Sequence, residues 1–309
     1  MSAKGSVMLV NKVGVDVDVP ASSELCVKSS IKQSVKADLH VHTTVSDGSD
    51  SFEQILTLAT GQGLTHLAFT DHDTLVGLDR ALALQQYTAI KIIGGIEISA
   101  WDKQLGTKVH VLGLGFSSSD APAIRALCEP LLMRRLENTF WQLEQLIKNW
   151  VLFDLELIES YAALSSCLYK QHLMAAITDA PFGSSLYDAM YNQLFKNGGI
   201  CDRDIAYVDA AEAVAAIKAD GGLAVLAHAG QQKNYDVVPR LKSVGLDGIE
   251  KYHPDHGETE WQIIDQLASE YALFQTGGSD YHGSFDLPPH PGSQTINQLP
   301  EALTSELSP

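Results

Sequence analysis

The sequence lacks several features that mark common protein classes. It has no apolar run of about eighteen residues, so no membrane-spanning helix is expected. Its start has neither the apolar stretch nor the cleavage site of a secretory signal. Cysteine is scarce, because the chain of 309 residues has only four, far apart and without a Cys-x-x-Cys pair. We therefore expect reduced thiols in a cytoplasmic protein, not a disulfide framework.

The sequence also has few positively charged residues. Against 38 acidic residues the chain has 21 lysines and arginines, which gives a formal net charge of −17. Neutralisation of phosphates by Lys and Arg supplies most non-specific affinity for nucleic acid, so this balance argues against a long duplex as partner. Cations held in a site still attract phosphate locally. We expect a small anionic substrate or a chain end, and not an extended duplex.

Apolar residues make up 45% of the chain, which is enough for a large core. From residue 37 onward, short apolar runs alternate with helical patterns. The runs expected to form strands lie at residues 67–69, 90–98, 109–116, 223–226, 248–250 and 272–274. Strands that alternate with helices predict parallel βαβ units. Polar residues repeatedly follow these runs, which predicts a barrel with its site at the carboxyl ends of the strands.

This alternation divides the chain into three parts. Residues 37–116 and 207–309 are expected to form the barrel. Residues 117–206 contain only helical patterns and no strand-like run, which predicts an inserted helical cap domain over the barrel mouth. In residues 1–36, valines alternate with small or acidic residues. This leader is expected to be either flexible or an added edge strand.

The first expected strand ends in Asp38-Leu39-His40-Val41-His42. Side chains on a strand repeat with a period of two, so His40 and His42 point the same way and both rings can bind one cation. Asp47 offers an oxygen ligand a few residues later. Asp38 is a candidate for orienting one of the imidazoles.

Further candidate ligands follow the later strands. The full set is His40, His42, Asp47, His72, Glu97, His110, His228, Asp280 and His282. Buried imidazoles need partners, so nine such residues at separate strand ends indicate a multinuclear metal site. Histidine together with carboxylate suits manganese, iron or zinc. Glu250 is expected to orient its neighbours, whereas His66 and His172 are not assigned to metal.

Seven segments carry a resemblance to a known family: DLHVHTTVSDG, TDHDT, GIEIS, VHVLGLGF, AVLAHAG, GIEKYHPDH and TGGSDYHG. They resemble the polymerase-and-histidinol-phosphatase (PHP) superfamily of metal-dependent phosphoesterases, from about residue 37 to 286. The resemblance implies an α/β fold, a distorted seven-stranded (β/α)7 TIM-like barrel, with three divalent ions: Mn²⁺ first, Fe²⁺ or Zn²⁺ as alternatives. It implies one ion at His40, His42, Glu97 and Asp280, a second at Asp47, His72 and His282, and a third at Glu97, His110 and His228.

The helical insertion resembles the branch with nucleoside 3′,5′-bisphosphate phosphatases and ribonuclease AM, in which the cap contacts the substrate. Arg134 and Arg135 are candidate phosphate clamps, because a guanidinium binds phosphate bidentately. His172 falls where the branch has a substrate-facing histidine. The alternative for all three is a solvated helix face. His253 and His256 are candidates for substrate contact or for protonating the leaving oxygen, the alternative being loop histidines with internal partners.

The expected function is hydrolysis of a phosphate monoester of a small nucleotide, of the 3′,5′-bisphosphonucleotide type, with exonuclease activity on short RNA as a further activity. A divalent cation lowers the pKa of bound water to about 7, which supplies hydroxide for attack on phosphorus. The expected catalytic residues are His42, Glu97, Asp280 and His282. Three alternatives are histidinol-phosphate phosphatase, a non-catalytic PHP module with a structural role, and an amidohydrolase. The inserted helices argue against the first, because that branch has no equivalent domain. The complete ligand set argues against the second, and Glu97 argues against the third, because amidohydrolases usually have a modified lysine at that position.

Overall fold

The computed structural model describes residues 34–287 and 290–306. Apart from residues 34–36, the expected leader lies outside the described residues. The strands are β1 (Ala37–Asp38), β2 (His66–Phe69), β3 (Lys91–Asp102), β4 (Thr107–Phe116), β5 (Val208–Asp209), β6 (Leu223–Leu226), β7 (Gly248–Tyr252) and β8 (Phe274–Gly277).

Seven of these strands form the barrel. They neighbour one another in the order β1-β2-β3-β4-β6-β7-β8, and β5 pairs with β3 at one side. The residues after β1 and β8 close the ring, since Leu39 N donates to Gly277 O at 3.1 Å and His42 N donates to Tyr281 O at 2.9 Å. The predicted fold, a distorted seven-stranded α/β barrel, is confirmed.

One strand runs against the prediction of parallel units throughout. β4 is antiparallel to both β3 and β6. The physical reason is the short connection at residues 103–106, because only antiparallel strands can be joined by a tight turn. Gly106 ends this turn with a positive φ of 65°. As a result Glu97 lies within the long strand β3 and His110 within β4, and neither follows a strand end.

Helices cover the outside of the barrel: α1 (Phe52–Gly61), α2 (Leu78–Ala83), α7 (Ala210–Ala219), α8 (Ala229–Gln232), α9 (Val238–Ser243) and α10 (Glu258–Tyr271). The last helix, α11 (Glu301–Glu306), instead packs Leu303 against residues of the barrel interior. The capping box expected at Ser51 and Gln54 opens α1. Leu39, Ile93, Leu112 and Val225 come from different strands and share one buried cluster, which places that cluster inside the barrel.

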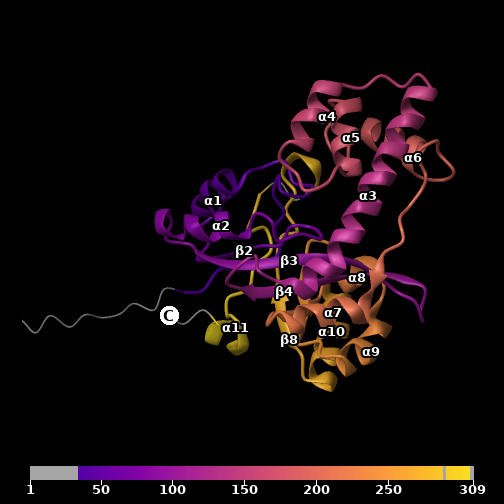
Figure 1. Cartoon of the computed structure of the whole chain (residues 1–309). Coiled ribbons are helices and arrows are strands. Elements are labelled where there is room, and N and C mark those ends of the chain that lie inside the picture. The colour runs from indigo at the N-terminus through magenta and orange to yellow at the C-terminus, as the bar shows by residue number, and fades with distance from the viewer. Residues whose placement is uncertain (1–33, 288–289, 307–309) are drawn as a thin grey trace, which may run out of the picture. The chain divides into compact units, whose positions relative to one another are not determined.

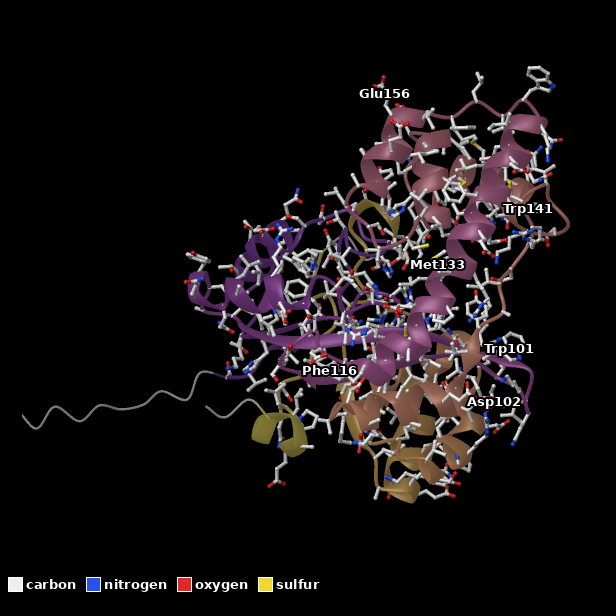
Figure 2. All side chains as sticks on the ribbon, in the orientation of Figure 1. Trp101, Asp102, Phe116, Met133, Trp141 and Glu156 are labelled. Atoms are coloured by element: carbon white, nitrogen blue, oxygen red, sulfur yellow. The ribbon has the colours of Figure 1, made fainter. Side chains whose placement is uncertain are left out.

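Residues 117–206 contain four helices and no strand. These are α3 (Pro122–Lys148), α4 (Leu155–Ala162), α5 (Lys170–Ile177) and α6 (Ser185–Phe195). Figure 1 shows them grouped on the side of β3 and β4 opposite α7, α9 and α10. Figure 2 labels Met133 and Trp141 on α3 and Glu156 on α4. The group has its own apolar cluster, which includes Leu146, Leu173 and Phe195.

No helix in the described part of the chain has the length and apolar character needed to cross a membrane.

Candidate metal centre and active site

The nine predicted ligand side chains lie together at one end of the barrel. His40, His42 and Asp47 follow β1, His72 follows β2, His228 follows β6, and Asp280 and His282 follow β8; Glu97 and His110 lie within β3 and β4. Every one is largely buried, and the most exposed is His110 with 21% of its side chain accessible. Buried charged groups are paired with one another or bind metal ions, so the contacts within this cluster decide what it can hold.

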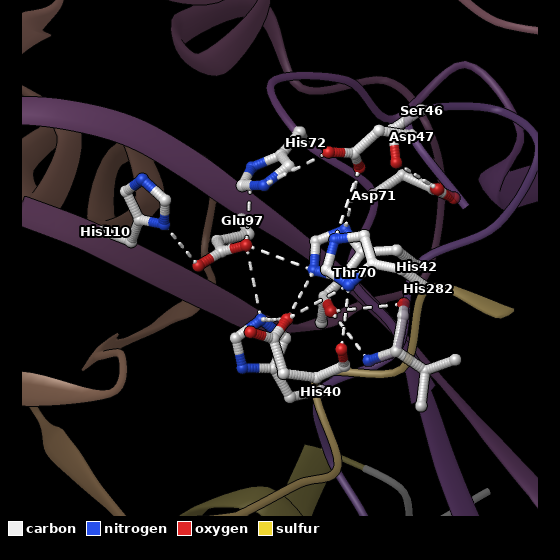
Figure 3. A network of polar contacts seen from close by, with 12 residues as sticks. His40, His42, Ser46, Asp47, Thr70, Asp71, His72, Glu97, His110 and His282 are labelled. Carbon is white, nitrogen blue, oxygen red and sulfur yellow. Dashed lines mark hydrogen bonds and ion pairs between the residues drawn. The ribbon is translucent and has the colours of Figure 1, made fainter. Parts of the chain in front are cut away.

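Glu97 lies at the centre of the cluster (Figure 3). Its Oε2 is 3.2 Å from His40 Nε2 and 3.1 Å from His42 Nε2. Its Oε1 is 2.9 Å from both His110 Nδ1 and His228 Nε2. The two oxygens therefore face two different sets of imidazoles, which is the arrangement that a bridging carboxylate needs.

Asp280 completes the first set. Its Oδ1 lies 3.2 Å from the Nε2 atoms of both His40 and His42. Two ligands bonded to a common ion at about 2.0–2.2 Å have atoms about 3 Å apart, so these separations fit a shared cation. The buried atoms without a hydrogen-bond partner include His40 Nε2, both ring nitrogens of His42, Asp47 Oδ1, His228 Nδ1 and Asp280 Oδ1. Because buried polar atoms almost always have a partner, this donor set fits divalent cations.

A second group forms around Asp47. Asp47 Oδ1 is 3.4 Å from His282 Nε2 and 3.7 Å from His42 Nδ1, and Asp47 Oδ2 is 3.9 Å from His72 Nε2. His42 thus reaches the second group through its other nitrogen, which the sequence did not indicate. His72 is also shared, because its Nδ1 lies 3.3 Å from Glu97 Oε2. His72, Glu97 and His110 form a third possible ligand group, beside the predicted one that contains His228.

Charge within the cluster is strongly coupled. Burial raises the pKa of Glu97 and Asp280, but the surrounding imidazoles outweigh it and hold both pKa values well below the usual range. Burial lowers the pKa of His282, yet Asp47 and Asp280 raise it to about 10. Burial lowers the pKa of His72 to about 4. The carboxylates therefore stay ionised, which is the form that binds a cation.

Two ligand positions have strained backbones. His228 has a φ of 24° and Asp280 a φ of 51°, in the left-handed region that residues with a Cβ rarely adopt. Asp280 N donates to His40 O at 2.9 Å, and His228 N donates to Glu250 Oε2 at 2.9 Å. Such strain costs on the order of 1–3 kcal/mol per residue and is typical of functional sites, where surrounding bonds maintain it.

Glu250 orients the ligands, as expected. Its Oε1 lies 3.1 Å from His40 Nδ1, so the other nitrogen of that ring faces the cluster. Asp38 does not contact an imidazole, contrary to expectation. It accepts hydrogen bonds from Ser279 N at 2.9 Å and Ser279 Oγ at 2.6 Å, and burial raises its pKa to about 6. Asp38 therefore joins the chain after β8 to β1 and does not orient a ring.

Two further positioning residues were missed by the sequence analysis. Asp71 accepts from Thr43 N at 2.8 Å and Ser46 Oγ at 2.7 Å, which fixes the loop that carries Asp47. It lies beside His72 in TDHDT, so the motif contained a signal for it. Gln171 on α5 donates to Asp47 Oδ2 at 3.1 Å. No pattern in the sequence connects residues 124 positions apart.

The two candidate phosphate clamps have different surroundings. Arg135 donates to Asp73 Oδ2 at 2.7 Å and to Ser99 Oγ at 3.0 Å, and its guanidinium lies over the ring of Tyr169. Its charge is thus matched inside the protein. Arg134 Nε donates to Ala206 O, a backbone carbonyl, at 2.8 Å.

The three other candidate substrate contacts also have internal partners. His172 is buried against the rings of Tyr161 and Phe285, and burial lowers its pKa to about 4. His253 Nε2 lies 3.2 Å from Asp280 Oδ2, so His253 supports a predicted ligand. His256 Nε2 accepts from Gly230 N at 3.0 Å and its Nδ1 donates to Lys251 O at 2.9 Å, which uses both ring nitrogens. None of the three histidines lines either cavity beside the cluster.

Two cavities adjoin the cluster, and Gln171 lines both. The first has a volume of about 180 Å³ and is lined by Asp47, His72 and His110 together with the cationic side chains Lys108, Arg135 and Lys170. The second, of about 910 Å³, has an aromatic and acidic lining that includes Tyr161, Phe182, Tyr187, Phe285, Asp50 and Asp286. Only the first cavity combines predicted metal ligands with cations, which makes it the candidate substrate site.

Comparison with known proteins agrees with this geometry. A phosphoribosyl 1,2-cyclic phosphate 1,2-diphosphodiesterase of Eggerthella lenta is 52% identical, over 82% of this chain and 97% of that protein. A 5′-3′ exoribonuclease of Haemophilus influenzae is 27% identical, over 80% and 90% of the two chains. A 3′,5′-nucleoside bisphosphate phosphatase of Chromobacterium violaceum is 25% identical, over 79% and 86%.

Solved structures show the same fold. A protein of Bifidobacterium adolescentis described as a metal-dependent phosphoesterase matches with a TM-score of 0.76 at 23% identity, over 88% of this chain and 95% of that one.

The side-chain cluster and the curated relatives define the class as a hydrolase of phosphoesters with a His, Asp and Glu cluster able to bind metal ions. The chain belongs to the PHP domain family, whose model matches residues 38–286. The predictions of family, fold and reaction class made from the sequence are therefore confirmed.

Proposed function

We propose that this protein hydrolyses the 1,2-cyclic phosphate of a phosphorylated ribose. The 52% identity to the Eggerthella lenta enzyme, over 97% of its length, carries this choice of substrate. The relatives named for nucleotides or RNA that are described above are 25–27% identical. The cavity of about 180 Å³ supports the choice, because it is below the usual range of about 300–1,000 Å³ for ligand sites and suits a sugar phosphate better than a polynucleotide.

Three divalent cations, Mn²⁺ first and Fe²⁺ or Zn²⁺ as alternatives, belong to this proposal. Their ligands are His40, His42, Glu97 and Asp280 for the first, Asp47, His72 and His282 for the second, and Glu97, His110 and His228 for the third. The unpartnered buried atoms and the two-sided contacts of Glu97 support the assignment. Such cations would supply a nucleophile at neutral pH by acidifying water and would withdraw charge from the phosphate.

The protein's own contribution is to hold the cluster in place before substrate binds. Glu250 fixes the ring of His40, His253 contacts Asp280, and Gln171 reaches Asp47 from α5. Because each contact comes from a different element, the ligand atoms need little rearrangement. The four residues predicted as catalytic, His42, Glu97, Asp280 and His282, act in this proposal as ligands. Asp47, His72 and His110 line the cavity, which supports a reacting phosphate bound at their end of it.

The test is a panel of substrates with chelator-treated protein reloaded with Mn²⁺. It compares phosphoribosyl 1,2-cyclic phosphate with 3′-phosphoadenosine 5′-phosphate, short 5′-phosphorylated RNA, histidinol phosphate and an aryl phosphate. We expect the highest kcat/KM on the cyclic phosphate. A higher value on any other member would overturn the choice of substrate.

Variants of the cluster test the metal assignment in the same assay. We expect His42→Ala and Asp280→Ala to lose turnover and bound metal while they keep the fold. The matched control is His66→Ala, because His66 is a half-buried histidine whose Nδ1 contacts Thr65 Oγ1 at 2.8 Å outside the cluster. Full metal content and turnover in both cluster variants would contradict the assignment.

A 3′,5′-bisphosphonucleotide is the second candidate, and one observation favours it. The cavity of about 910 Å³ lies just across Gln171 from the cluster, with the rings of Tyr161, Phe182 and Phe285 in its walls. Nucleobases stack on such rings. A higher kcat/KM for 3′-phosphoadenosine 5′-phosphate than for the cyclic phosphate would select this candidate.

A further inference from the structure

The inner face of β4 continues from the barrel core into the candidate substrate cavity. Leu112, His110 and Lys108 occupy alternate positions of this strand, so their side chains share one face. Leu112 packs in the barrel cluster, His110 contacts Glu97, and Lys108 lines the cavity. With a rise of about 3.4 Å per residue, Lys108 begins about 7 Å further along the strand than His110. That spacing is comparable to the distance between two phosphates on opposite sides of a pentose ring.

Lys108 already has an anionic partner from the segment before β5. Its Nζ is 2.8 Å from Asp204 Oδ2 and donates to Tyr207 Oη at 3.3 Å. Tyr207 in turn donates to Asp204 Oδ1 at 2.7 Å. Asp204 and Tyr207 therefore hold Lys108 at the cavity wall, where a phosphate can replace or join them as its partner.

Lys170 lines the same cavity from the first turn of α5, and it has no hydrogen bond or ion pair within the described chain. Burial lowers its pKa; Asp204 opposes this effect, while Lys196, Lys108 and Arg135 add to it. A half-buried ammonium group that neighbouring cations destabilise is unfavourable unless an anion binds beside it. The N-terminus of α5 adds partial positive charge at this point.

Among the charged side chains that line the cavity, apart from the predicted metal ligands, one cation has no anionic partner. The cations are Lys108, Lys170 and Arg135. Asp204 matches Lys108 and Asp73 matches Arg135. Lys170 is therefore the unmatched charge. Asp73 matches the charge of Arg135, whose Nε has no hydrogen-bond partner at the cavity.

We propose that Lys108 and Lys170 together bind the phosphate of the substrate that is not hydrolysed. Binding there would make the enzyme selective for substrates with two phosphates about one pentose ring apart. The inference rests on the proposed function only in placing the reacting phosphate at the metal ligands. It assigns the selectivity for the second phosphate to Lys108 of β4 and to Lys170, the first residue of α5.

The test compares substrates with and without the second phosphate. Lys108→Ala, Lys170→Ala and the double variant are assayed on phosphoribosyl 1,2-cyclic phosphate and on ribose 1,2-cyclic phosphate. Each single variant should lower kcat/KM on the doubly phosphorylated substrate about tenfold or more, mainly through KM, since one charge-assisted bond is lost. The value on the singly phosphorylated substrate should stay unchanged, and Lys→Arg at either position should restore most of the loss.

The control variant is Lys148→Ala, which removes an exposed lysine of α3 that pairs with Glu144 and lines no cavity described here. A second readout does not need turnover: ribose 5-phosphate binding to metal-free protein, by calorimetry, should weaken in the double variant and not in the control. Equal loss on both substrates, or unchanged ribose 5-phosphate binding, would overturn the inference. Unfolding curves of the variants show whether the fold is kept.

Failure of the proposed function remains distinguishable from failure of this inference. If the wild-type protein hydrolyses 3′-phosphoadenosine 5′-phosphate instead of the cyclic phosphate, the same variants are compared on that compound and on 3′-adenosine monophosphate. A lower kcat/KM on the bisphosphate alone supports phosphate binding by the two lysines. A lower kcat/KM on both compounds contradicts it.

Discussion

At the scale of single residues, Arg134 and Arg135 show how far neighbours in sequence can differ in surroundings. Arg135 pairs with Asp73, whose side chain has no exposed surface, and it stacks on Tyr169. Arg134 bonds a carbonyl oxygen at an exposed position. Their sequence pattern is the same, so the charge balance of each was not visible before the fold was known.

We predict that Arg135→Ala destabilises the protein far more than Arg134→Ala. Removal of Arg135 leaves Asp73 buried without its counter-charge, and breaking a buried pair in this way costs about 3–5 kcal/mol. Arg134→Ala removes one bond at the surface and should stay within about 0.5–1 kcal/mol of wild type. Urea unfolding followed by circular dichroism measures both. Equal midpoints for the two variants would contradict the assigned pairing.

The side chains that meet in the cluster were predictable at this scale, whereas the residues that hold them in position were only partly predictable. His40, His42 and His72 lie in short motifs whose residue types are restricted by the chemistry of cation binding. Lys108 and its partner Asp204 lie 96 positions apart, on opposite sides of the four helices of residues 117–206. Such pairs are set by the fold and leave no local pattern.

At the scale of elements, apolar runs located the strands but not their directions. The run at 109–116 matches β4 closely, yet the strand is antiparallel to both neighbours. Direction depends on the connection, and the signal was present in the short segment between Asp102 and Thr107. The expected strand at 37–42 is also shorter in the structure, since β1 covers Ala37–Asp38 and the chain continues by single bridges.

The closure of the barrel gives a prediction about two glycines. A Cβ on Gly278 would lie 2.5 Å from the backbone nitrogen of His40, because the chain after β8 passes directly over β1. Gly278→Ala should therefore cost about 1–3 kcal/mol or more, as overpacking does, and lower turnover by displacing His40.

Gly61→Ala is the matched control for the closure, because Gly61 is the last residue of α1 and no atom would lie within 4 Å of its new Cβ. We expect this variant to gain up to about 0.5–1 kcal/mol, since alanine favours a helix over glycine. Thermal unfolding and kcat/KM are measured on both variants. A Gly278→Ala protein as stable and active as Gly61→Ala would refute the close approach.

At the scale of the described molecule, the alternation of strands and helices was enough to predict a barrel, because few folds accommodate that order. The helical content of residues 117–206 was equally visible. What could not be read was how these helices meet the barrel. Tyr169 Oη donates to His72 O at 3.1 Å and Ser165 Oγ to Ser46 O at 2.6 Å, across about a hundred residues of chain.

Because side chains from many strands meet in the cluster, the proposed cations would stabilise the whole barrel when they bind. The ligands follow or lie within six of its strands, and Asp280 and His228 adopt strained backbone conformations to reach the centre. Buried carboxylate and imidazole atoms of the cluster face one another at about 3 Å, and several of them have no hydrogen-bond partner in the described structure. A ligand that binds only the folded state adds RT ln(1 + [L]/Kd), about 2.7 kcal/mol at a hundredfold excess over Kd.

We therefore predict that Mn²⁺ raises the melting temperature of chelator-treated protein by several degrees, at about 2–4 °C per kcal/mol for a chain of this size class. Glu97→Gln keeps the shape of the central side chain but removes the charge that faces both sets of imidazoles, so it should abolish most of this shift. His66→Ala should keep the full shift. The three proteins are compared by scanning calorimetry at increasing Mn²⁺ concentrations. An equal shift in all three would mean that the cation binds elsewhere, because Glu97 contacts both sets of imidazoles through its Oε1 and Oε2 atoms.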